Sequence, residues 1–422
     1  MTKRVLMIAY HFPPSKGSSG LQRTLKFSQY LPQFGWQPLI LSASKRAYAT
    51  TSREQLNNIS AEVKITRAFA LDTARHFSIN GAYSKLLAIP DRWVSWLLGG
   101  IVSGLQLIYK MKPQIIWSTY PIATAHLIGY GLHRLTGLPW IADLRDPMAQ
   151  EGYPEDPLRW KSFKWIEDKI ARHAAAICFT SPSAIDEFMN KHRGTVSSET
   201  LHLIENGYDE ECFTEAEAIA KANTAGGNRP LTLLHSGIIY PSERDPRPFF
   251  QALANLKKIG AITATSFRVV FRAAGHDDYL AEHIRSAELE DIIQLAPPIP
   301  YIDALVEMLA ADGLILFQAS NCNYQIPAKL YEYIRAGRPI FAMTDTHGDT
   351  AKILPKTARN SIANIASSDD IENKIVRFIS LLGSVAESPE SIEHFSRREK
   401  TRELANLLDS IAYRVAAASP PG

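Results

Sequence analysis

The stretch IPAKLYEYIRAGRPIFAMT, residues 326–344, predicts a helix that is followed at once by a buried strand. Pro327 suits the first helical turn because no helical N–H is needed there, and Gly337 suits the left-handed position that ends a helix. The apolar run 338–344 follows without a polar break. A helix that leads directly into a short apolar strand is typical of a parallel sheet covered by helices.

Short apolar runs of the same kind alternate with helical patterns along the whole chain. The expected strands are 4–10, 36–42, 113–121, 139–146, 175–181 and 201–206 in the first half, and 230–237, 267–275, 292–298, 312–318 and 338–344 in the second. Near-continuous apolar strands joined by helices predict α/β folding with parallel sheets covered on both faces. We therefore expect two Rossmann-like domains.

The predicted domain boundaries follow from where this alternation pauses. The segment 214–230 is rich in Ala, Asn and Gly and has no sustained apolar face, so we expect a linker or a peripheral excursion there. The N-terminal domain then spans residues 1–210 and the C-terminal domain spans 211–389. Residues 390–422 are expected to form a last helix, which packs back on the N-terminal domain, and a short tail.

Composition and charge limit the classes of function. The chain has 422 residues and a net charge of only +3, with basic and acidic residues interspersed, so nucleic-acid binding is not expected. Cys178, Cys212 and Cys322 lie far apart in the sequence, which argues against a disulfide framework or a structural zinc site and favours a cytoplasmic location. The apolar run at 5–10 is too short for a signal peptide.

The longest stretch without a charged residue is WVSWLLGGIVSGLQLIY, residues 93–109. A membrane-spanning helix needs about 20 predominantly apolar residues, whereas this stretch has 17 and includes serines, glycines and a glutamine. We therefore expect a buried or half-buried helix. The alternative is peripheral contact with the inner face of a membrane near Trp93 and Trp96.

Ligands of open parallel sheets bind beyond the carboxyl ends of the strands, so the loops at those ends are the candidate sites. The loop after the first strand contains Gly17, Ser18, Ser19 and Gly20, whose N–H groups are able to approach an anion near a helix N-terminus. The alternative is that both glycines serve the turn alone. Because the loop is not GxGxxG and no acidic residue closes the second strand, a nicotinamide dinucleotide site is not expected.

Three charges crowd the end of a later strand, in DLRDPM at 143–148. Asp143, Arg145 and Asp146 form either an internal ion-pair cluster or a site. In a site, the carboxylates accept hydrogen bonds from sugar hydroxyls and the guanidinium faces a phosphate.

The second half carries a similar arrangement in LLHSGIIYPSERDPRPFFQAL, residues 233–253. The strand ends at Gly237, and Asp245 suits the N-cap of the helix that follows. Arg244 and Arg247 then lie at the N-terminus of that helix, where a cation opposes the helix dipole at a cost of up to about 1 kcal/mol. Either a diphosphate compensates these charges, or the arginines are simply solvated.

Lys329 and Glu332 lie on one face of the helix in the opening stretch. Three residues apart, they form either a helical ion pair worth a few tenths of a kcal/mol or a donor site. In a donor site, Lys329 and the free N–H groups meet a diphosphate, and Glu332 accepts hydrogen bonds from a ribose diol. We place Leu330, between them, in the same donor-binding set.

The chain contains no DxD triplet, the carboxylate pair with which many enzymes bridge a diphosphate through a divalent metal. We therefore expect no metal and no other cofactor, with cations and helix N-termini stabilising a departing diphosphate. The motifs GxSxG, HExxH and GxxxxGK[ST] are also absent, so serine hydrolase, zincin and P-loop functions have no support.

With these residues located, the chain resembles GT-B glycosyltransferases of the large retaining family four group. The resemblance spans nearly the whole length and rests on segments in the expected order: HFPPSKGSSGLQRTLKFSQYLPQFGWQP, PDRWVSW, LTGLPWIADLRDPM, AAAICFTSPSAIDEF, ENGYDEECF, LLHSGIIYPSERDPRPFFQAL and IPAKLYEYIRAGRPI. It implies two Rossmann-like domains facing across a cleft, a sugar nucleotide held mainly by the second domain, and metal-free transfer with retention at the anomeric carbon.

The resemblance also implies roles for single residues. Glu332 matches the glutamate that binds the ribose, Arg244 looks like the basic residue on the diphosphate, and Lys329 matches a lysine near the phosphates. Arg145 falls where many relatives have a histidine near the donor sugar. The loop at 17–20 corresponds to the glycine loop below the diphosphate.

Two positions depart from the family pattern. The first of the family's paired glutamates is replaced by Tyr324, which puts the donor-sugar contacts in doubt. The arginine that often follows the second-domain glycine is replaced by Ile238, so that either Arg244 alone or Arg244 with Arg247 carries more of the phosphate charge.

The function predicted from the sequence is transfer of a sugar from a nucleotide diphosphate sugar to a saccharide or lipid-linked saccharide, in polysaccharide or cell-envelope glycan biosynthesis. The expected partners are those two substrates and, peripherally, a membrane. Two alternatives stay open: a GT-B-shaped sugar nucleotide epimerase, and a non-catalytic GT-B scaffold that binds a partner.

Overall fold

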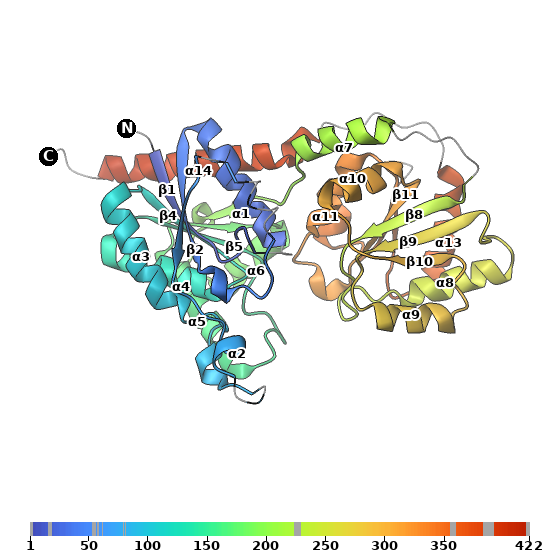
Figure 1. The fold of residues 1–422 in the computed structure, drawn as a ribbon, viewed down its shortest axis with the longest axis horizontal. Coiled ribbons are helices and arrows are strands. Elements are labelled where there is room, and N and C mark those ends of the chain that lie inside the picture. The colour runs from blue at the N-terminus through green and yellow to red at the C-terminus, as the bar shows by residue number, and fades with distance from the viewer. Residues whose placement is uncertain are drawn as a thin grey trace. The chain divides into compact units, whose positions relative to one another are not determined.

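The computed structural model describes residues 3–15, 19–52, 56, 59–60, 62–78, 80, 82–222, 229–354, 360–382 and 392–418. Contacts divide the chain into two compact units (Figure 1). Unit 1 consists of Met1–Glu205 together with Arg397–Gly422, and unit 2 consists of Asn206–Ser396. Each unit is built on its own parallel sheet, as the alternating pattern of the sequence predicted.

Unit 1 has a seven-stranded sheet in the order β3-β2-β1-β4-β5-β6-β7, in which all neighbours are parallel. The strands are β1 Lys3–Ile8, β2 Trp36–Ala43, β3 Lys64–Ala68, β4 Ile115–Thr119, β5 Trp140–Arg145, β6 Ala176–Phe179 and β7 Leu201–Leu203. The strand order reverses between β1 and β4. In an open parallel sheet, that reversal marks the place where loops diverge and ligands bind.

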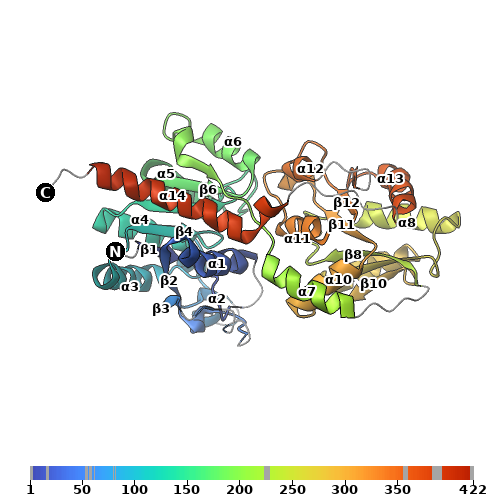
Figure 2. The same cartoon turned by 90° about the horizontal axis from the view of Figure 1, so that it is seen from above.

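Helices cover both faces of this sheet (Figure 2). They are α1 Ser19–Tyr30, α2 Thr73–His76, α3 Trp96–Met111, α4 Ala123–Thr136, α5 Pro157–His173, α6 Pro182–Lys191 and α14 Arg397–Ala418. Successive residues of β1 point to opposite faces, as a strand requires. Leu6 and Ile8 join the core beneath α3, α4 and α5, whereas Val5 and Met7 join the core beneath α1 and α14.

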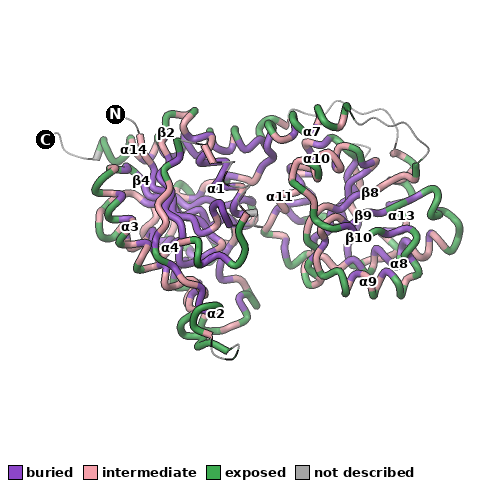
Figure 3. The backbone as a smooth tube through the Cα atoms, viewed as in Figure 1, coloured by how far each residue is buried: buried purple, intermediate pink, exposed green. Residues whose placement is uncertain are grey.

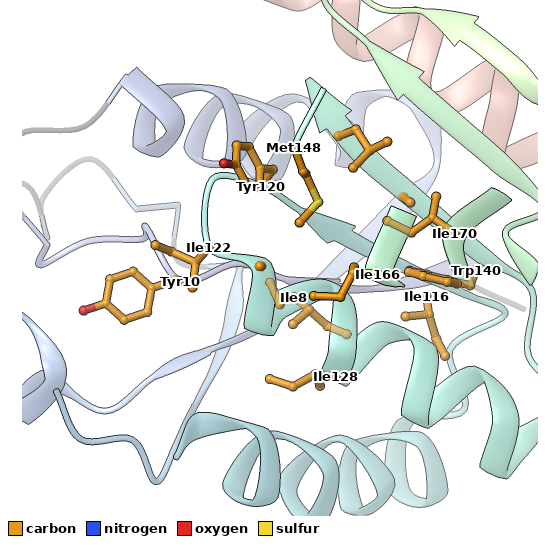
Figure 4. Packing of buried hydrophobic residues seen from close by; sticks show 14 of the residues in the cluster. Ile8, Tyr10, Ile116, Tyr120, Ile122, Ile128, Trp140, Met148, Ile166 and Ile170 are labelled. Atoms are coloured by element: carbon orange, nitrogen blue, oxygen red, sulfur yellow. The ribbon is translucent and has the colours of Figure 1, made fainter. Parts of the chain in front are cut away.

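The interior of unit 1 is almost completely buried along its central strands (Figure 3). In the core beneath α4 and α5, Ile8 and Ile116 of the sheet pack with Ile128 and Ile166 of the two helices (Figure 4). Trp140 closes this core, and its Nε1 donates to Ser118 Oγ at 2.8 Å. Burial of this kind contributes about 1.5–3 kcal/mol for each large side chain.

The C-terminal helix α14 belongs to unit 1 and lies along α1. Leu404 and Leu408 fill the core between them. Asp409 accepts from Trp36 Nε1 at 2.8 Å and pairs with Lys3 of β1 at 2.5 Å, which ties the end of the chain to its beginning.

Unit 2 repeats the arrangement with six parallel strands in the order β10-β9-β8-β11-β12-β13. The strands are β8 Leu231–Ser236, β9 Phe267–Arg272, β10 Ile293–Ala296, β11 Gly313–Phe317, β12 Ile340–Met343 and β13 Ser361–Ala363. The helices are α7 Glu210–Ala222, α8 Arg247–Lys258, α9 Asp277–Ser286, α10 Tyr301–Ala310, α11 Ala328–Ala336, α12 Asp349–Ile353 and α13 Ser368–Leu381. The strand order reverses between β8 and β11.

The structure corrects two expectations. Trp96 is fully buried in the core of unit 1, so it cannot contact a membrane, and Trp93 is partly buried with its ring centroid 4.6 Å from that of Tyr10. In the part of the chain that the structure describes, no helix is long and apolar enough to cross a bilayer. The expected linker at 214–230 begins with the helix α7, because Phe213 and Ala216 are buried in the core that this helix shares with α10.

Candidate functional site

The candidate site of unit 2 forms where β8 ends and α11 begins. Gly237 follows β8 with φ of 107°, a conformation that side chains rarely adopt. A Cβ atom at this position would stand 3.0 Å from Lys329 Nζ. Glycine therefore leaves the space into which the lysine of α11 extends its ammonium group.

His235, the penultimate residue of β8, holds that ammonium group in place. Its Nδ1 lies 2.9 Å from Ile315 O, and its Nε2 lies 3.1 Å from Lys329 Nζ. Because the carbonyl is only an acceptor, Nδ1 carries the hydrogen and Nε2 accepts from the lysine. Burial, together with the charge of Lys329, moves the pKa of His235 well below its usual value, so the imidazole is neutral near pH 7.

Two cations share this corner of unit 2. Burial and the nearby charge of Arg244 move the pKa of Lys329 well below the usual 10.5, while Glu332 acts in the opposite direction. Arg244 donates to Ile238 O at 2.5 Å and lies over the Tyr240 ring at 5.3 Å. Two like charges that depress a pKa in this way form a place where an anion is stabilised.

Arg247 is held differently from Arg244. It is exposed and forms an ion pair with Asp245 at 2.6 Å. Asp245 Oδ1 also accepts from the backbone N–H of Arg247 at 3.0 Å, so the aspartate caps the first turn of α8 as expected. The N-cap residue of α8 is Pro246, one position later than predicted, because the helix begins at Arg247.

Glu332 lies one turn after Lys329 on α11 and accepts from the hydroxyl of Tyr301 at 2.7 Å. These two charged side chains thus contact different groups, Tyr301 for one and His235 for the other. Leu330 is fully buried, and its N–H donates to Pro327 O at 2.9 Å, so the structure gives it a position in the core. Tyr324, which stands where the resemblance predicts the first of two paired glutamates, is 40% exposed.

In unit 1, Asp143 is committed to an internal ion pair. Arg23 of α1 donates two hydrogen bonds to its carboxylate, from Nε to Oδ2 at 3.0 Å and from Nη2 to Oδ1 at 2.8 Å. The hydroxyl of Thr119 donates to Oδ2 at 2.8 Å. Arg23 also donates to the carbonyls of Ile204 and Glu205 at 2.9 Å. The fully buried Asp143 therefore joins β5 to α1 and to the segment after β7.

Arg145 and Asp146 lie beyond this pair at the end of β5. The guanidinium of Arg145 is buried. Burial raises the pKa of Asp146, whereas the positive charge of Arg145 lowers it; the effect of burial is larger. His11, after β1, is kept neutral because burial and the charge of Arg145 lower its pKa to about 4. The carboxyl ends of β1 and β5 thus bring together a cation, a carboxyl group and a neutral imidazole.

The loop that carries Arg145 and Asp146 is fixed from behind by Glu167 of α5. Its Oε1 accepts from the N–H groups of Met148 and Ala149 at 2.6 and 3.1 Å. Burial raises the pKa of Glu167 to about 7. Glu167 and His235 are the supporting residues that sequence reasoning missed, since each acts through another residue. The sequence feature that could have identified His235 is its position two residues before Gly237, the glycine that follows β8.

The glycine loop lies largely outside the described residues. Gly17 and Ser18 belong to the part of the chain that the structure does not describe, whereas Ser19 and Gly20 are the first residues of α1. Among the described residues, no group of three His, Cys, Asp or Glu side chains is able to hold a metal ion.

No protein-family model matches the chain, and no curated protein matches its sequence. Solved structures match its fold along nearly the whole length. HepE from Anabaena in complex with UDP-glucose has a TM-score of 0.66 at 14% identity, with 96% of this chain and 99% of HepE covered. The lipopolysaccharide outer core galactosyltransferase WaaB has a TM-score of 0.61 at 13% identity, with 96% and 99% covered.

A putative UDP-N-acetylglucosamine 2-epimerase from Listeria monocytogenes has a TM-score of 0.60 at 11% identity, with 100% of this chain and 99% of the epimerase covered. At such identities the likeness shows the fold alone. The fold is that of GT-B proteins, with two Rossmann-like α/β units, which confirms the predicted fold class.

Proposed function

We propose that the chain is a glycosyltransferase of the retaining family four type, which moves a sugar from a nucleotide diphosphate sugar to a saccharide or lipid-linked saccharide. The observation that carries the proposal is the cation pair of unit 2, Lys329 and Arg244, at the carboxyl end of β8. Gly237 opens this corner, and Glu332 lies one helical turn away. Those are the groups that a diphosphate and a ribose diol require.

In the proposed reaction, a hydroxyl of the acceptor attacks the anomeric carbon on the face that the diphosphate leaves. The bond between that carbon and the diphosphate oxygen breaks, and its electron pair goes to the diphosphate. The departing diphosphate oxygen takes the proton of the attacking hydroxyl. Lys329 and Arg244 stabilise the negative charge that develops there. The reaction needs no metal in this proposal because these two cations occupy the place of the metal charge.

Lys329 is held ready for this role by His235. A neutral imidazole accepts one N–H of the ammonium group at 3.1 Å and leaves its other hydrogens for the phosphate oxygens. Since a bound diphosphate brings negative charge, it returns the pKa of Lys329 towards its ordinary value. The site therefore favours the anion over an uncharged ligand.

The acceptor and its location are proposed from the outer face of α3. Leu98, Val102, Leu105 and Tyr109 follow one side of this helix and are 36–86% exposed. Residues 92–142 contain no Asp or Glu, while Lys110 and Lys112 follow the apolar face. We propose that this face rests on an anionic bilayer from the cytoplasmic side, where lipid-linked saccharides of a cell-envelope glycan are found.

Calorimetric titration of the full chain with UDP and GDP tests the donor site. We expect one of them to bind, and Glu332→Gln to weaken it by roughly tenfold or more, because a charge-assisted hydrogen bond contributes about 1.5–3 kcal/mol. Glu290→Gln, which changes an exposed glutamate of unit 2, serves as the matched control. Failure of both nucleotides to bind, or equal affinity in the two variants, contradicts the proposal.

The second candidate is a sugar nucleotide epimerase, which the similarity to the Listeria protein supports. An epimerase converts UDP-N-acetylglucosamine without an acceptor, whereas a transferase releases UDP only when water or a saccharide takes the sugar. Proton NMR of the wild-type chain with this sugar nucleotide separates the two. Appearance of the 2-epimer in the absence of an acceptor excludes the transferase assignment.

A further inference from the structure

The backbone of Arg145 departs from regular strand geometry at the candidate site of unit 1. Its φ is 65°, which is strained for a residue with a long side chain, and the pairing of β5 with β6 shifts register between Asp143 and Arg145. The N–H of Asp146 donates to Leu144 O at 2.7 Å, so the chain makes a tight turn around Arg145. Strain of this kind costs about 1–3 kcal/mol and persists only where neighbours enforce it.

Thr180, which follows β6, enforces that turn. Both its N–H and its Oγ1 lie 3.0 Å from Arg145 O. A few residues later, Glu167 accepts hydrogen bonds from the N–H groups of Met148 and Ala149. Thr180 and Glu167 therefore hold the loop at both of its ends. Arg145 is buried at this turn, with only 8% of the residue exposed.

The guanidinium at this buried position lacks acceptors. Its Nη1 makes one long hydrogen bond, 3.5 Å to Tyr120 O, and its buried Nε has no partner in the described part of the chain. A guanidinium has five N–H donors, and a buried donor without an acceptor costs about 1–3 kcal/mol. Two carboxyl groups act on the charge of Arg145. Asp143 is already held by Arg23, and Asp146 forms no ion pair with Arg145 in the described part of the chain.

We propose that Arg145 binds an anionic substituent, a carboxylate or a phosphate, on one of the two sugars that the protein handles. The proposal rests on the function proposed above and narrows its substrate class. A planar guanidinium matches either group with two parallel hydrogen bonds. Asp146 beside it is able to accept from, or donate to, a hydroxyl of the same sugar.

The surrounding charges agree with an anion at this place. His11 is neutral, and its pKa of about 4 means that it does not add a second cation near pH 7. Asp146 has a raised pKa, so an approaching anion meets a carboxyl group that takes up a proton more readily than usual. Arg145 is then the residue that supplies the positive charge for the ligand.

The test uses the full chain and two sets of probes in calorimetry. UDP-glucuronate against UDP-glucose examines the donor sugar. Glucuronate and glucose 6-phosphate against glucose, each with and without UDP, examine the acceptor. In one arm we expect the charged probe to bind at least about tenfold more tightly than the neutral one, as a charge-assisted hydrogen bond predicts.

Variants then assign the preference to the guanidinium. Arg145→Gln is expected to abolish it and to leave the affinity for UDP within about twofold, because a charge-assisted hydrogen bond to the sugar alone is lost. Arg145→Lys keeps the charge without the planar fork and should retain only part of the preference. Arg193→Gln, an exposed arginine of the same unit, is the matched control and should change nothing.

Three results overturn the proposal: charged and neutral probes that bind wild type equally or not at all, a preference that survives in Arg145→Gln, and a loss of UDP affinity in that variant as large as the loss for the sugar. The last result assigns Arg145 to the diphosphate. The acceptor arm without UDP still reports on Arg145 if the nucleotide fails to bind, so failure of the donor site is distinguished from failure of this one.

Discussion

The two units share one strand order but treat buried charge in opposite ways at the point where that order reverses. In unit 2, the side-chain nitrogen of Lys329 contacts the neutral His235, and this lysine forms no ion pair among the described residues. In unit 1, Arg23 and Asp143 neutralise each other in a fully buried ion pair. The fold thus fixes where charges gather, whereas the partner of each charge decides whether it binds a ligand or supports the structure.

This contrast also separates two arginines of unit 1. Arg23 satisfies its donors on Asp143 and on two backbone carbonyls, while the guanidinium of Arg145 makes one hydrogen bond, at 3.5 Å, in the described part of the chain. Both side chains are more than nine-tenths buried. Burial alone therefore does not separate the structural Arg23 from Arg145, for which we propose a ligand; the count of satisfied donors separates them.

The largest expected effect comes from breaking the structural ion pair. Arg23→Met leaves Asp143 buried without its partner, so unit 1 should lose about 3–5 kcal/mol of unfolding free energy. All seven tryptophans lie between residues 36 and 165, so their fluorescence during urea unfolding reports on unit 1 alone.

The matched control for this variant is Asp146→Asn in the neighbouring loop. Because burial already disfavours the ionised form of Asp146, removing its charge should change the stability of unit 1 little or raise it. Equal unfolding midpoints for wild type and Arg23→Met would show that the pair is not structural.

Lys329, the charge of unit 2 that we propose binds the diphosphate, gives the next largest effect. Lys329→Met should weaken UDP binding by roughly ten- to a hundredfold, because a hydrogen bond to a charged group contributes about 1.5–3 kcal/mol. The tryptophan unfolding curve should stay unchanged, since the substitution lies outside unit 1. Lys258→Met, at an exposed lysine of α8, is the control in calorimetry. Equal losses in both variants would assign the effect to net charge.

The stability of the free protein should also depend on pH through Lys329. Its pKa is lowered in the folded state and returns to the ordinary 10.5 on unfolding, so the unfolded state binds more protons between these two values. Unfolding free energy therefore rises with pH through this window, by at most about 1.4 kcal/mol per pH unit. Far-UV circular dichroism in urea over a series of pH values below 10.5 should show a steeper rise in wild type than in Lys329→Met, and parallel curves would refute it.

Particular strands show which parts of the fold could be predicted from the sequence. The central strands were predictable because burial on both faces makes them continuous apolar runs. Two edge strands were not predicted. β3, with the sequence KITRA, is half polar, and β13, with the sequence SIA, has only three residues. The helix α7 was mistaken for a linker since its small alanines weaken the apolar periodicity on which a prediction depends.

The sequence could predict a residue of the candidate site only where the type and position of that residue alone indicate a ligand. The sequence placed Gly237, Lys329 and Arg244 in one donor site, and the structure brings these three together. It could not tell that Asp143 is committed to Arg23, 120 residues earlier, because such pairing is created by the fold. The neutral His235 was missed for the same reason.

A second contrast between the units concerns the helix that comes directly before the fourth strand of each sheet. In unit 2 that helix is α10, which is covered by α7. In unit 1 it is α3, which packs inward on α4 and on the strands β2 and β3, while Leu98, Val102, Leu105 and Tyr109 remain exposed on its outer side. The equivalent position thus has a protein cover in one unit and an apolar exposed face in the other, which is where we propose the bilayer.

The smallest expected effect tests this face. Leu98→Ser removes a side chain that is 76% exposed, so stability should change by no more than about 0.5 kcal/mol. Sedimentation with vesicles that contain anionic lipid should show binding weakened by about fivefold, since partial burial of one leucine contributes about 1 kcal/mol. Val376→Ser, at an exposed valine of unit 2, should bind like wild type. If Leu98→Ser also binds like wild type, α3 does not rest on the bilayer, and its apolar face must be covered by a protein, as α10 is.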